Sequence, residues 1–214
     1  MIEIELNNIL LRFETKDTIF SPGYIDKGTL AMLSQVEFKE KDKVLDLGCG
    51  YGVVGILAGR IIGGSNVFMC DVSEEAVALA HINAELNGVN DVTILLSDGL
   101  SNITEENFTI ILSNPPYHVD FSVPKNFIEQ GYKKLSLGGR MYMVTKREDW
   151  YKNKLISVFG GVKIVEIDGY YVFIAEKRIQ KFPKQRENEN KKENHLSKKL
   201  KRKQDGKRLI KKAL

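Results

Sequence analysis

The stretch VLDLGCGYG at residues 44–52 points most directly to the architecture, because a short apolar strand runs straight into a glycine-rich turn. An apolar segment from Val53 to Ile62 follows and predicts a helix. Glycines permit sharp turns and let a ligand approach the backbone closely. In open α/β sheets, ligands bind at this junction beyond the carboxyl ends of the strands. The stretch therefore predicts a binding site as well as a fold.

Beyond this stretch, strands and helices alternate along the chain, which predicts a mostly parallel sheet with helices on both faces. Two further β-rich runs, Val162–Ile167 and Tyr170–Ala175, are joined at Asp168-Gly169, a dipeptide suited to a two-residue hairpin turn. The fold class is thus α/β, with an antiparallel hairpin closing the sheet. The other predicted elements are strands at 66–70, 92–96, 109–112 and 141–145 and helices at 74–87 and 125–135.

Apolar patterning on the amino-terminal side predicts two strands, at 2–6 and 9–14, that form a hairpin. Ser21-Pro22-Gly23 breaks the chain before a helically spaced apolar pattern begins. We therefore expect a hairpin and lead-in at residues 1–24, the main α/β domain at 25–177, and a Lys/Arg-rich tail at 178–214.

The charge is unevenly distributed along the 214 residues. The net charge of +4 combines a mildly acidic body with a strongly basic end, since 16 of the 32 Lys and Arg residues but only 4 of the 28 acidic residues lie from Lys177 onward. Two cysteines cannot frame a disulfide scaffold, no Cys/His cluster has zinc-ligand spacing, and no apolar run reaches the ~18 residues needed to cross a bilayer. These features predict a soluble cytoplasmic protein without a structural metal.

Two carboxylates follow the next two predicted strands. Asp71 lies about 20 residues beyond the glycines, where a carboxylate can accept hydrogen bonds from both ribose hydroxyls of a nucleoside. Asp98 follows the third strand and could accept from an adenine amino group. Both could instead simply cap the following helix or turn. The run 50–55 also matches the dinucleotide fingerprint G-x-G-x-x-G, so a dehydrogenase is an alternative.

The tetrad Asn114-Pro115-Pro116-Tyr117 follows an apolar strand and suggests a chemistry. Consecutive prolines fix the backbone and remove two donors, which leaves carbonyl oxygens to accept hydrogen bonds. An Asn amide oxygen beside such a carbonyl can hold the two hydrogens of an exocyclic amine, and Tyr117 offers a flat face for a base. The alternative is a rigid loop with a surface aromatic residue.

Five segments together resemble the small-domain family of class I S-adenosylmethionine-dependent methyltransferases, in order from about Ile9 to Lys177. Among its members the chain is most similar to ribosomal RNA guanine-N2 methyltransferases, in which a histidine such as His118 often follows the tetrad. It departs from them at Val119-Asp120 and lacks the extra amino-terminal half-domain of longer members. The segments are Phe20-Ser21-Pro22-Gly23, Asp26-Lys27-Gly28-Thr29, residues 44–52, residues 83–88 (NAELNG) and Asn114-Pro115-Pro116-Tyr117.

The resemblance implies a seven-stranded sheet, the cofactor S-adenosyl-L-methionine, and methyl transfer to an exocyclic amine held by Asn114, Pro115, Pro116 and Tyr117. Guanine N2 in ribosomal RNA is the expected target. Adenine N6 in RNA or DNA, a protein glutamine amide, and a non-catalytic RNA- or ribosome-binding factor are the alternatives. The residues expected at the cofactor are Asp26, Lys27, Gly28, Thr29, Asp46, Gly48, Cys49, Gly50, Gly52, Asp71, Val72, Asp98, Gly99 and Asn114.

The basic tail suggests an RNA partner. Nine Lys and Arg residues lie between Lys198 and Lys212, dense enough to bind a phosphate backbone by counterion release. Charge runs are more commonly solvated extensions, so the alternative is a disordered or helical segment that only aids solubility. We expect the tail to tether the protein to RNA.

Overall fold

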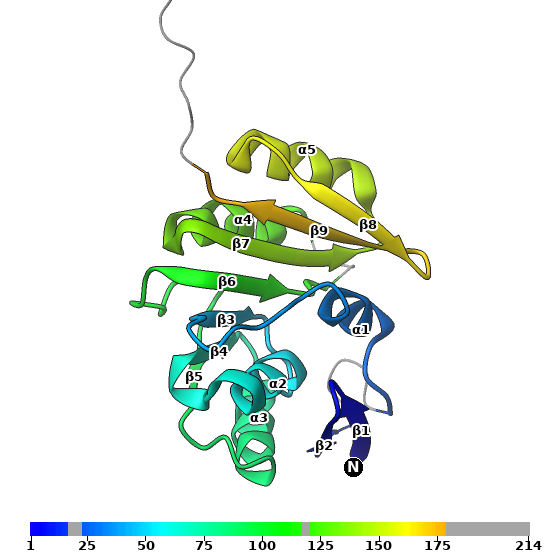
Figure 1. The fold of residues 1–214 in the computed structure, drawn as a ribbon, viewed down its shortest axis with the longest axis vertical. Helices are drawn as coiled ribbons and strands as arrows, with labels where there is room; N and C mark the ends of the chain where they lie inside the picture. The colour runs from blue at the N-terminus through cyan, green and yellow to red at the C-terminus, as the bar shows by residue number, and fades with distance from the viewer. Residues whose placement is uncertain (17–22, 117–119, 179–214) are drawn as a thin grey trace, which may run out of the picture. The chain divides into compact units, whose positions relative to one another are not determined.

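The computed structural model describes residues 1–16, 23–116 and 120–178 (Figure 1). Met1–Arg178 form one compact unit. The predicted tail beyond Arg178, the start of the lead-in motif at Phe20-Ser21-Pro22, and Tyr117, His118 and Val119 lie outside the described residues. Within the described ranges, no helix combines the length and the apolar character needed to cross a membrane.

Within the described residues, seven strands form the central sheet and two more form a separate hairpin. The strands are β1 (Ile2–Leu6), β2 (Ile9–Phe13), β3 (Val44–Leu47), β4 (Val67–Asp71), β5 (Thr93–Leu96), β6 (Phe108–Ser113), β7 (Leu135–Thr145), β8 (Lys163–Ile167) and β9 (Tyr170–Glu176). The sheet order is β5-β4-β3-β6-β7-β9-β8, and the first five run parallel while β9 pairs antiparallel with both β7 and β8. The predicted seven-stranded, mostly parallel sheet with a closing antiparallel hairpin is confirmed.

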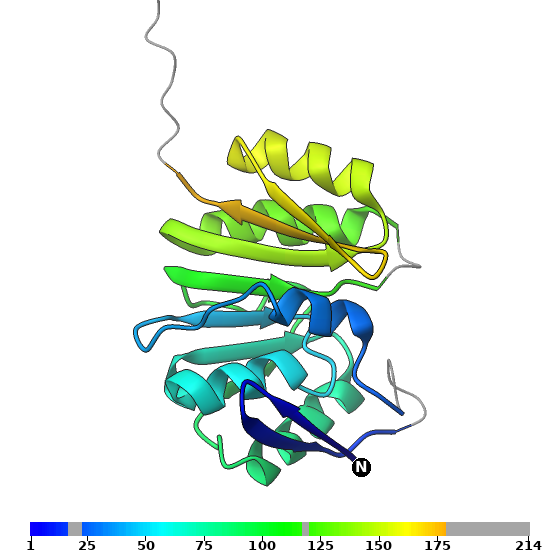
Figure 2. The same cartoon turned by 45° about the vertical axis from the view of Figure 1, so that its right-hand side comes forward.

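Helices cover both faces of this sheet (Figures 1 and 2). One apolar core lies between the sheet and α1, α2 and α3, and a second lies between the sheet and α4 and α5. All four residues of β3 are buried, as expected for a parallel strand covered on both sides. The helices are α1 (Lys27–Leu33), α2 (Val53–Ile62), α3 (Glu74–Leu86), α4 (Ser122–Lys134) and α5 (Glu148–Phe159), with a short 3₁₀ turn η1 (Gly64–Asn66).

Two predicted boundaries were wrong, both next to residues that usually interrupt regular structure. The helix expected from 125 begins at Ser122, and it accommodates Pro124 because this residue lies in the first turn, where no intrahelical donor is needed. The strand expected from 141 begins at Leu135 and continues through an irregularity at Gly138, which has a φ of +81°. At these two places, a proline and a glycine that often interrupt regular structure lie inside an element.

Two asparagine side chains attach the amino-terminal hairpin to α3, which lies beside it in Figure 2. The Asn87 amide accepts from the Arg12 N–H at 3.0 Å and donates to the Arg12 carbonyl at 2.6 Å. Asn83 makes the same pair of bonds with the backbone of Glu14, at 2.7 and 3.0 Å. Asn83 also donates to the carbonyl of Tyr51 at 2.9 Å. These amides satisfy the backbone groups along β2 and its end, so the hairpin is tied to the loop that follows β3.

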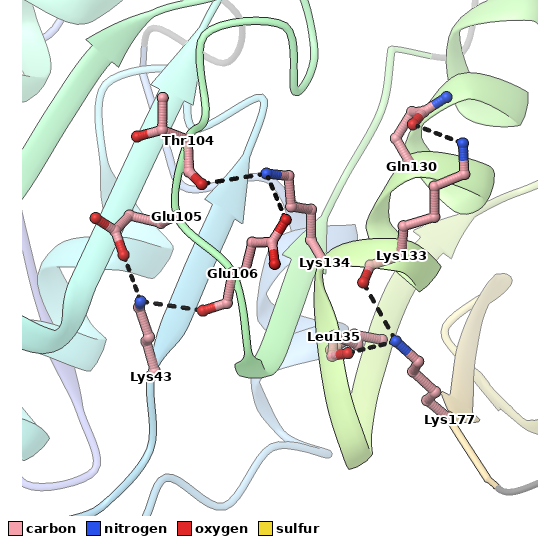
Figure 3. A network of polar contacts seen from close by, with 9 residues as sticks. All are labelled: Lys43, Thr104, Glu105, Glu106, Gln130, Lys133, Lys134, Leu135 and Lys177. Carbon is pink, nitrogen blue, oxygen red and sulfur yellow. Dashed lines mark hydrogen bonds and ion pairs between the residues drawn. The ribbon is translucent and has the colours of Figure 1, made fainter.

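A polar network occupies the amino-terminal edge of the parallel strands (Figure 3). The ammonium group of Lys43 pairs with Glu105 at 2.6 Å and donates to the Glu106 carbonyl at 3.1 Å. Lys177 donates to the carbonyls of Leu135 at 2.6 Å and Lys133 at 3.2 Å. These contacts join the starts of β3, β6 and β7 to the end of β9.

Candidate functional site

A cavity of about 400 Å³ lies at the carboxyl-terminal edge of the parallel strands. It is bounded by the turns after β3, β4, β5 and β6 and by parts of α1 and α4. This is the location expected for a ligand site in an open α/β sheet. The predicted site residues that line it are Asp26, Thr29, Asp46, Gly48, Cys49, Gly50, Asp71, Val72, Asp98, Gly99, Asn114 and Pro116.

The glycine loop after β3 is tied to the end of β4 by its own backbone. The N–H groups of Gly48 and Cys49 both donate to the Cys70 carbonyl at 2.9 Å, and the Gly50 N–H donates to the Asp71 carboxylate at 2.9 Å. Gly48 and Gly50 have φ values of +76° and +54°, a region that side-chain-bearing residues rarely adopt. A phosphate cradle requires backbone amides directed at the ligand. The N–H groups of Gly48, Cys49 and Gly50 are bonded within the protein and are therefore not available for such a cradle.

Asp71 is fixed by two backbone donors. Besides the bond from Gly50, its second carboxylate oxygen accepts from the Ser73 N–H at 3.0 Å. The backbone carbonyl of Asp71 accepts from the Ser97 N–H at 2.8 Å, which aligns the ends of β4 and β5. Asp98 follows in the next turn and is exposed. The two carboxylates therefore stand on adjacent strand ends along one wall of the cavity.

Asp46 is the most deeply placed carboxylate of the cavity, with 3% of its surface exposed. One of its oxygens accepts from the Gly55 N–H at 2.9 Å. Burial raises the pKa of Asp46 to about 7, partly offset by the Gly55 bond and reinforced by the charge of Asp71. Of the described residues that line the cavity, none is Lys, Arg or His. The ionised form of Asp46 would therefore gain from a cationic ligand.

Asn114, directly after β6, is held by two groups of α1. Its amide nitrogen donates to Asp26 at 2.7 Å and to the Thr29 hydroxyl at 3.0 Å. Asp26 also caps α1 by accepting from the Thr29 N–H at 3.0 Å. A carboxylate can only accept, so the nitrogen of the Asn114 amide must face Asp26. These contacts, across 88 residues of sequence, set the orientation of the amide.

Several predicted site residues are absent from the lining of the cavity. Lys27 is exposed. Gly28 packs against Tyr170, such that an added Cβ would lie 2.8 Å from two ring carbons. Gly52 precedes α2 with a φ of +102°, and Pro115 is buried. Gly28 and Gly52 therefore shape the walls through close packing and a tight turn.

Other lining residues were not predicted from the sequence. Val123 and Phe127 reach the cavity from α4, and Ile25 and Ser97 line it from the turns. Apolar residues on a predicted helix carry no local sign of which one faces a ligand. Their position depends on how α4 packs against the sheet.

Both cysteines line the cavity as protonated thiols. Burial raises the pKa of Cys70 to about 12 and that of Cys49 well above its usual value, with nearby carboxylates adding to both shifts. The thiolate is the reactive form of cysteine. These side chains therefore serve as small apolar parts of the wall.

Comparison with known proteins places this site in a family context. The family model described as the methyltransferase small domain matches residues 10–175. The uncharacterized protein YbxB of Bacillus subtilis is 32% identical over 178 residues, covering 80% of this chain and 89% of its own. Ribosomal RNA small subunit methyltransferase C of Shewanella amazonensis is 31% identical over 164 residues, covering 75% of this chain and 47% of its own.

A solved structure is also similar. It is the 16S rRNA N2 G1207 methyltransferase (RsmC) of T. thermophilus in complex with AdoMet and guanosine. It superposes with a TM-score of 0.76 at 26% identity, covering 83% of this chain and 50% of its own. The chain spans about half the length of the named ribosomal RNA methyltransferases that it matches.

Proposed function

Because the chain belongs to the methyltransferase small domain family, whose members take the methyl group from S-adenosylmethionine, we propose that it methylates an exocyclic amine of an RNA base. Guanine N2 in ribosomal RNA is the proposed target. Its support is the similarity to enzymes that carry this activity in their names, together with the Asn114 arrangement.

We assign the cofactor to the acidic cavity. S-adenosylmethionine supplies a methyl group made electrophilic by a positively charged sulfur. The fit is supported by charge, since Asp26, Asp46, Asp71 and Asp98 line the cavity with no cation among its described lining residues. The same charge disfavours the pyrophosphate of a dinucleotide, which argues against a dehydrogenase.

Each cavity residue receives a role from its position. Asp71, held rigid by two amides, would accept hydrogen bonds from the ribose hydroxyls, and Asp98 with Gly99 and Val72 would border the adenine. Asp46 with Gly48, Cys49 and Gly50 would surround the methionine part. Gly28 and Gly52 would act indirectly, by fixing the walls.

The Asn114 amide is the main support for the proposed binding of the substrate amine. With its nitrogen bound by Asp26 and Thr29, the amide presents its oxygen to a substrate amine, and the carbonyl of Pro115 would accept the second hydrogen. Hydrogen bonds in a chain polarise one another, so the Asp26 contact makes the amide oxygen a stronger acceptor. As positive charge develops on the amine nitrogen, these oxygens stabilise the transition state more than the ground state.

The basic tail at residues 178–214 would add sequence-independent contact with RNA. Its charge compensates for an acidic body that would otherwise repel a polyanion. If deletion of residues 179–214 leaves both RNA affinity and its salt dependence unchanged, the tail is not a tether.

Nucleoside mass spectrometry tests the proposed target. RNA from cells lacking the protein should have lost one methylguanosine, and incubation with the purified protein and S-adenosylmethionine should restore it. The Asp71→Ala protein should restore nothing, because it lacks the proposed ribose contact. If N6-methyladenosine is lost instead, adenine is the target. If all RNA nucleosides are intact and a methylated protein glutamine is lost, the target is a protein.

A further inference from the structure

Two basic residues leave the sheet beside the acceptor motif. Lys146 and Arg147 directly follow Thr145, the last residue of β7. The neighbouring strand β6 ends at Ser113, directly before Asn114, and the two strands run parallel. Both basic side chains are exposed. They therefore lie at the same sheet edge as the acidic cavity, on the side of the acceptor tetrad.

Aromatic rings hold these two cations in place. The ammonium of Lys146 lies 4.8 Å from the ring centre of Tyr170, and the guanidinium carbon of Arg147 lies 5.2 Å from that of Phe121. Phe121 stacks on Trp150 with centroids 4.4 Å apart and an angle of 16°. Cations over aromatic faces keep their charge and their hydrogen-bond donors for other groups.

Lys27 extends the same surface through α1. It is exposed and directly precedes Gly28, whose backbone packs against the Tyr170 ring that also contacts Lys146. We call Lys27, Lys146 and Arg147 the basic rim. In the described ranges, no carboxylate lies within ion-pairing distance of any of the three.

Nearby acidic residues only partly offset this charge. Glu148 is paired with Lys152 at 3.5 Å, and Asp149 is exposed in the first turn of α5. The cavity beside the rim carries carboxylates and repels phosphate. An RNA strand that presents a base to Asn114 must carry its phosphates past this edge, so cations outside the cavity are needed to hold them.

We propose that the basic rim binds backbone phosphates of the RNA strand next to the methylated nucleotide. This inference rests on the proposed RNA substrate and assigns the rim a positioning role. Lys27, expected from the sequence at the cofactor, takes part in substrate binding instead. Lys146 and Arg147 would fix the strand beside the acceptor site.

A salt titration of RNA binding by the full-length protein tests the rim. The probe is a short single-stranded RNA of mixed sequence, followed by fluorescence anisotropy. The Lys146→Gln/Arg147→Gln protein should bind about tenfold more weakly, and the slope of log affinity against log salt should shrink by about 1.4, or ~0.7 per lost phosphate contact. Its affinity for S-adenosylmethionine, measured by calorimetry, should stay unchanged.

Two control proteins separate local contact from general charge. Lys146→Arg/Arg147→Lys keeps both charges and should keep the slope. Lys39→Gln/Lys41→Gln removes two exposed charges before β3, at the opposite edge of the sheet, and should change the slope little. The proposal is overturned if the slope falls equally in this Lys39/Lys41 control, or if the slope is unchanged in Lys146→Gln/Arg147→Gln.

Methylation of RNA from cells lacking the protein distinguishes this failure from failure of the proposed function. If the wild-type protein methylates that RNA and Lys146→Gln/Arg147→Gln has the same KM for RNA, the proposed role of the basic rim is wrong and the proposed function stands. If the wild-type protein methylates a protein but no RNA, the proposed function fails and the rim fails with it. A raised KM for RNA with unchanged cofactor affinity supports both.

Discussion

At the amino-terminal edge of the sheet, Lys43 and Lys134 form ion pairs within the protein, whereas at the carboxyl-terminal edge four carboxyl groups face a cavity. Lys43 contacts Glu105 (Figure 3). Its ammonium group also lies 5.1 and 5.2 Å from the ring centres of Phe68 and Phe108. Lys134 pairs with Glu106 at 3.7 Å. The cavity at the other edge is lined by four carboxylates and, among its described residues, by no cation.

The difference shows how one sheet separates stability from ligand binding. Ion pairs at the amino-terminal edge join strand ends that lie away from the cavity. At the carboxyl-terminal edge, backbone N–H groups hold the carboxyl groups of Asp46 and Asp71, and no cation stands among the described residues that line the cavity, so both groups can interact with a ligand there. Substitutions at the two edges should therefore have different consequences.

Asn114→Ala should have the largest effect, at the ligand edge. It removes the oriented amide oxygen, so kcat should fall by about 10²–10³-fold, the range seen when one stabilising group is lost from a transition-state site. The fall should be seen in a radiolabelled methyl-transfer assay, with cofactor affinity from calorimetry near the wild-type value. An Asn114→Ala protein that methylates at the wild-type rate would remove Asn114 from the chemistry.

Gly28→Ala tests whether α1 must sit close to Tyr170. The new Cβ would lie 2.8 Å from ring carbons and 2.9 Å from the Asp26 carboxylate, so α1 must shift. We expect a loss of about 1–3 kcal/mol in the free energy of unfolding, measured with urea, and a lower kcat because Asp26 orients Asn114. Gly161→Ala is the matched control, since nothing lies within 4 Å of its added Cβ. Equal stability of the two proteins would contradict the close packing.

The pH dependence of cofactor binding tests Asp46. Its pKa of about 7 means that it ionises as pH rises through neutrality, so affinity for the cationic cofactor should increase roughly tenfold between about pH 6 and about pH 8. Calorimetry at each pH should show this rise, and Asp46→Asn should flatten it. A rise of the same size in Asp46→Asn would assign it to another group.

In the ligand-free protein, ionisation of Asp46 lowers the free energy of unfolding. Its folded pKa lies above the ordinary value of 3.8, so the folded state binds the proton more tightly. The contribution is fully present below about pH 4 and is lost as pH rises to about 7. In Asp46→Asn, this part of the pH dependence of unfolding should disappear.

Lys43→Met should have the smallest effect and should not alter chemistry. It keeps the apolar stem but removes an ammonium whose partner Glu105 is 45% exposed, so solvent screening limits the loss to about 1 kcal/mol. Thermal unfolding should detect the change, while kcat and KM stay at wild-type values. A clear fall in kcat would show that the two edges are coupled.

The predicted α/β class, the closing hairpin and the family resemblance are confirmed, because their signals are local. Asp168-Gly169 forms the turn between β8 and β9 with φ values of +50° and +76°, as its residue types indicate. The helix at Val53–Ile62 has the predicted bounds, since its apolar run is bordered by glycines at both ends. The roles of individual site residues stay predictions that the substitutions above can test.

Long-range contacts could not be predicted in this way. In the sequence, Asn83 and Asn87 are recognised only as part of the motif at residues 83–88. In the structure they have backbone partners 69 and 75 residues away. The bond between Asn114 and Asp26 likewise depends on α1 packing near the end of β6. Side-chain amides of this kind give no local pattern.

The sequence by itself determined which chemistry-bearing residues follow which strands, because strand, glycine turn and helix are encoded by neighbouring residues. Parallel strands then necessarily bring those residues to one edge. Only the tertiary structure decided which of them line the cavity, which way the Asn114 amide faces, and that Lys27 lies outside the cavity. These depend on packing between distant segments, where a side chain's direction is set by its neighbours in space and not by those in the chain.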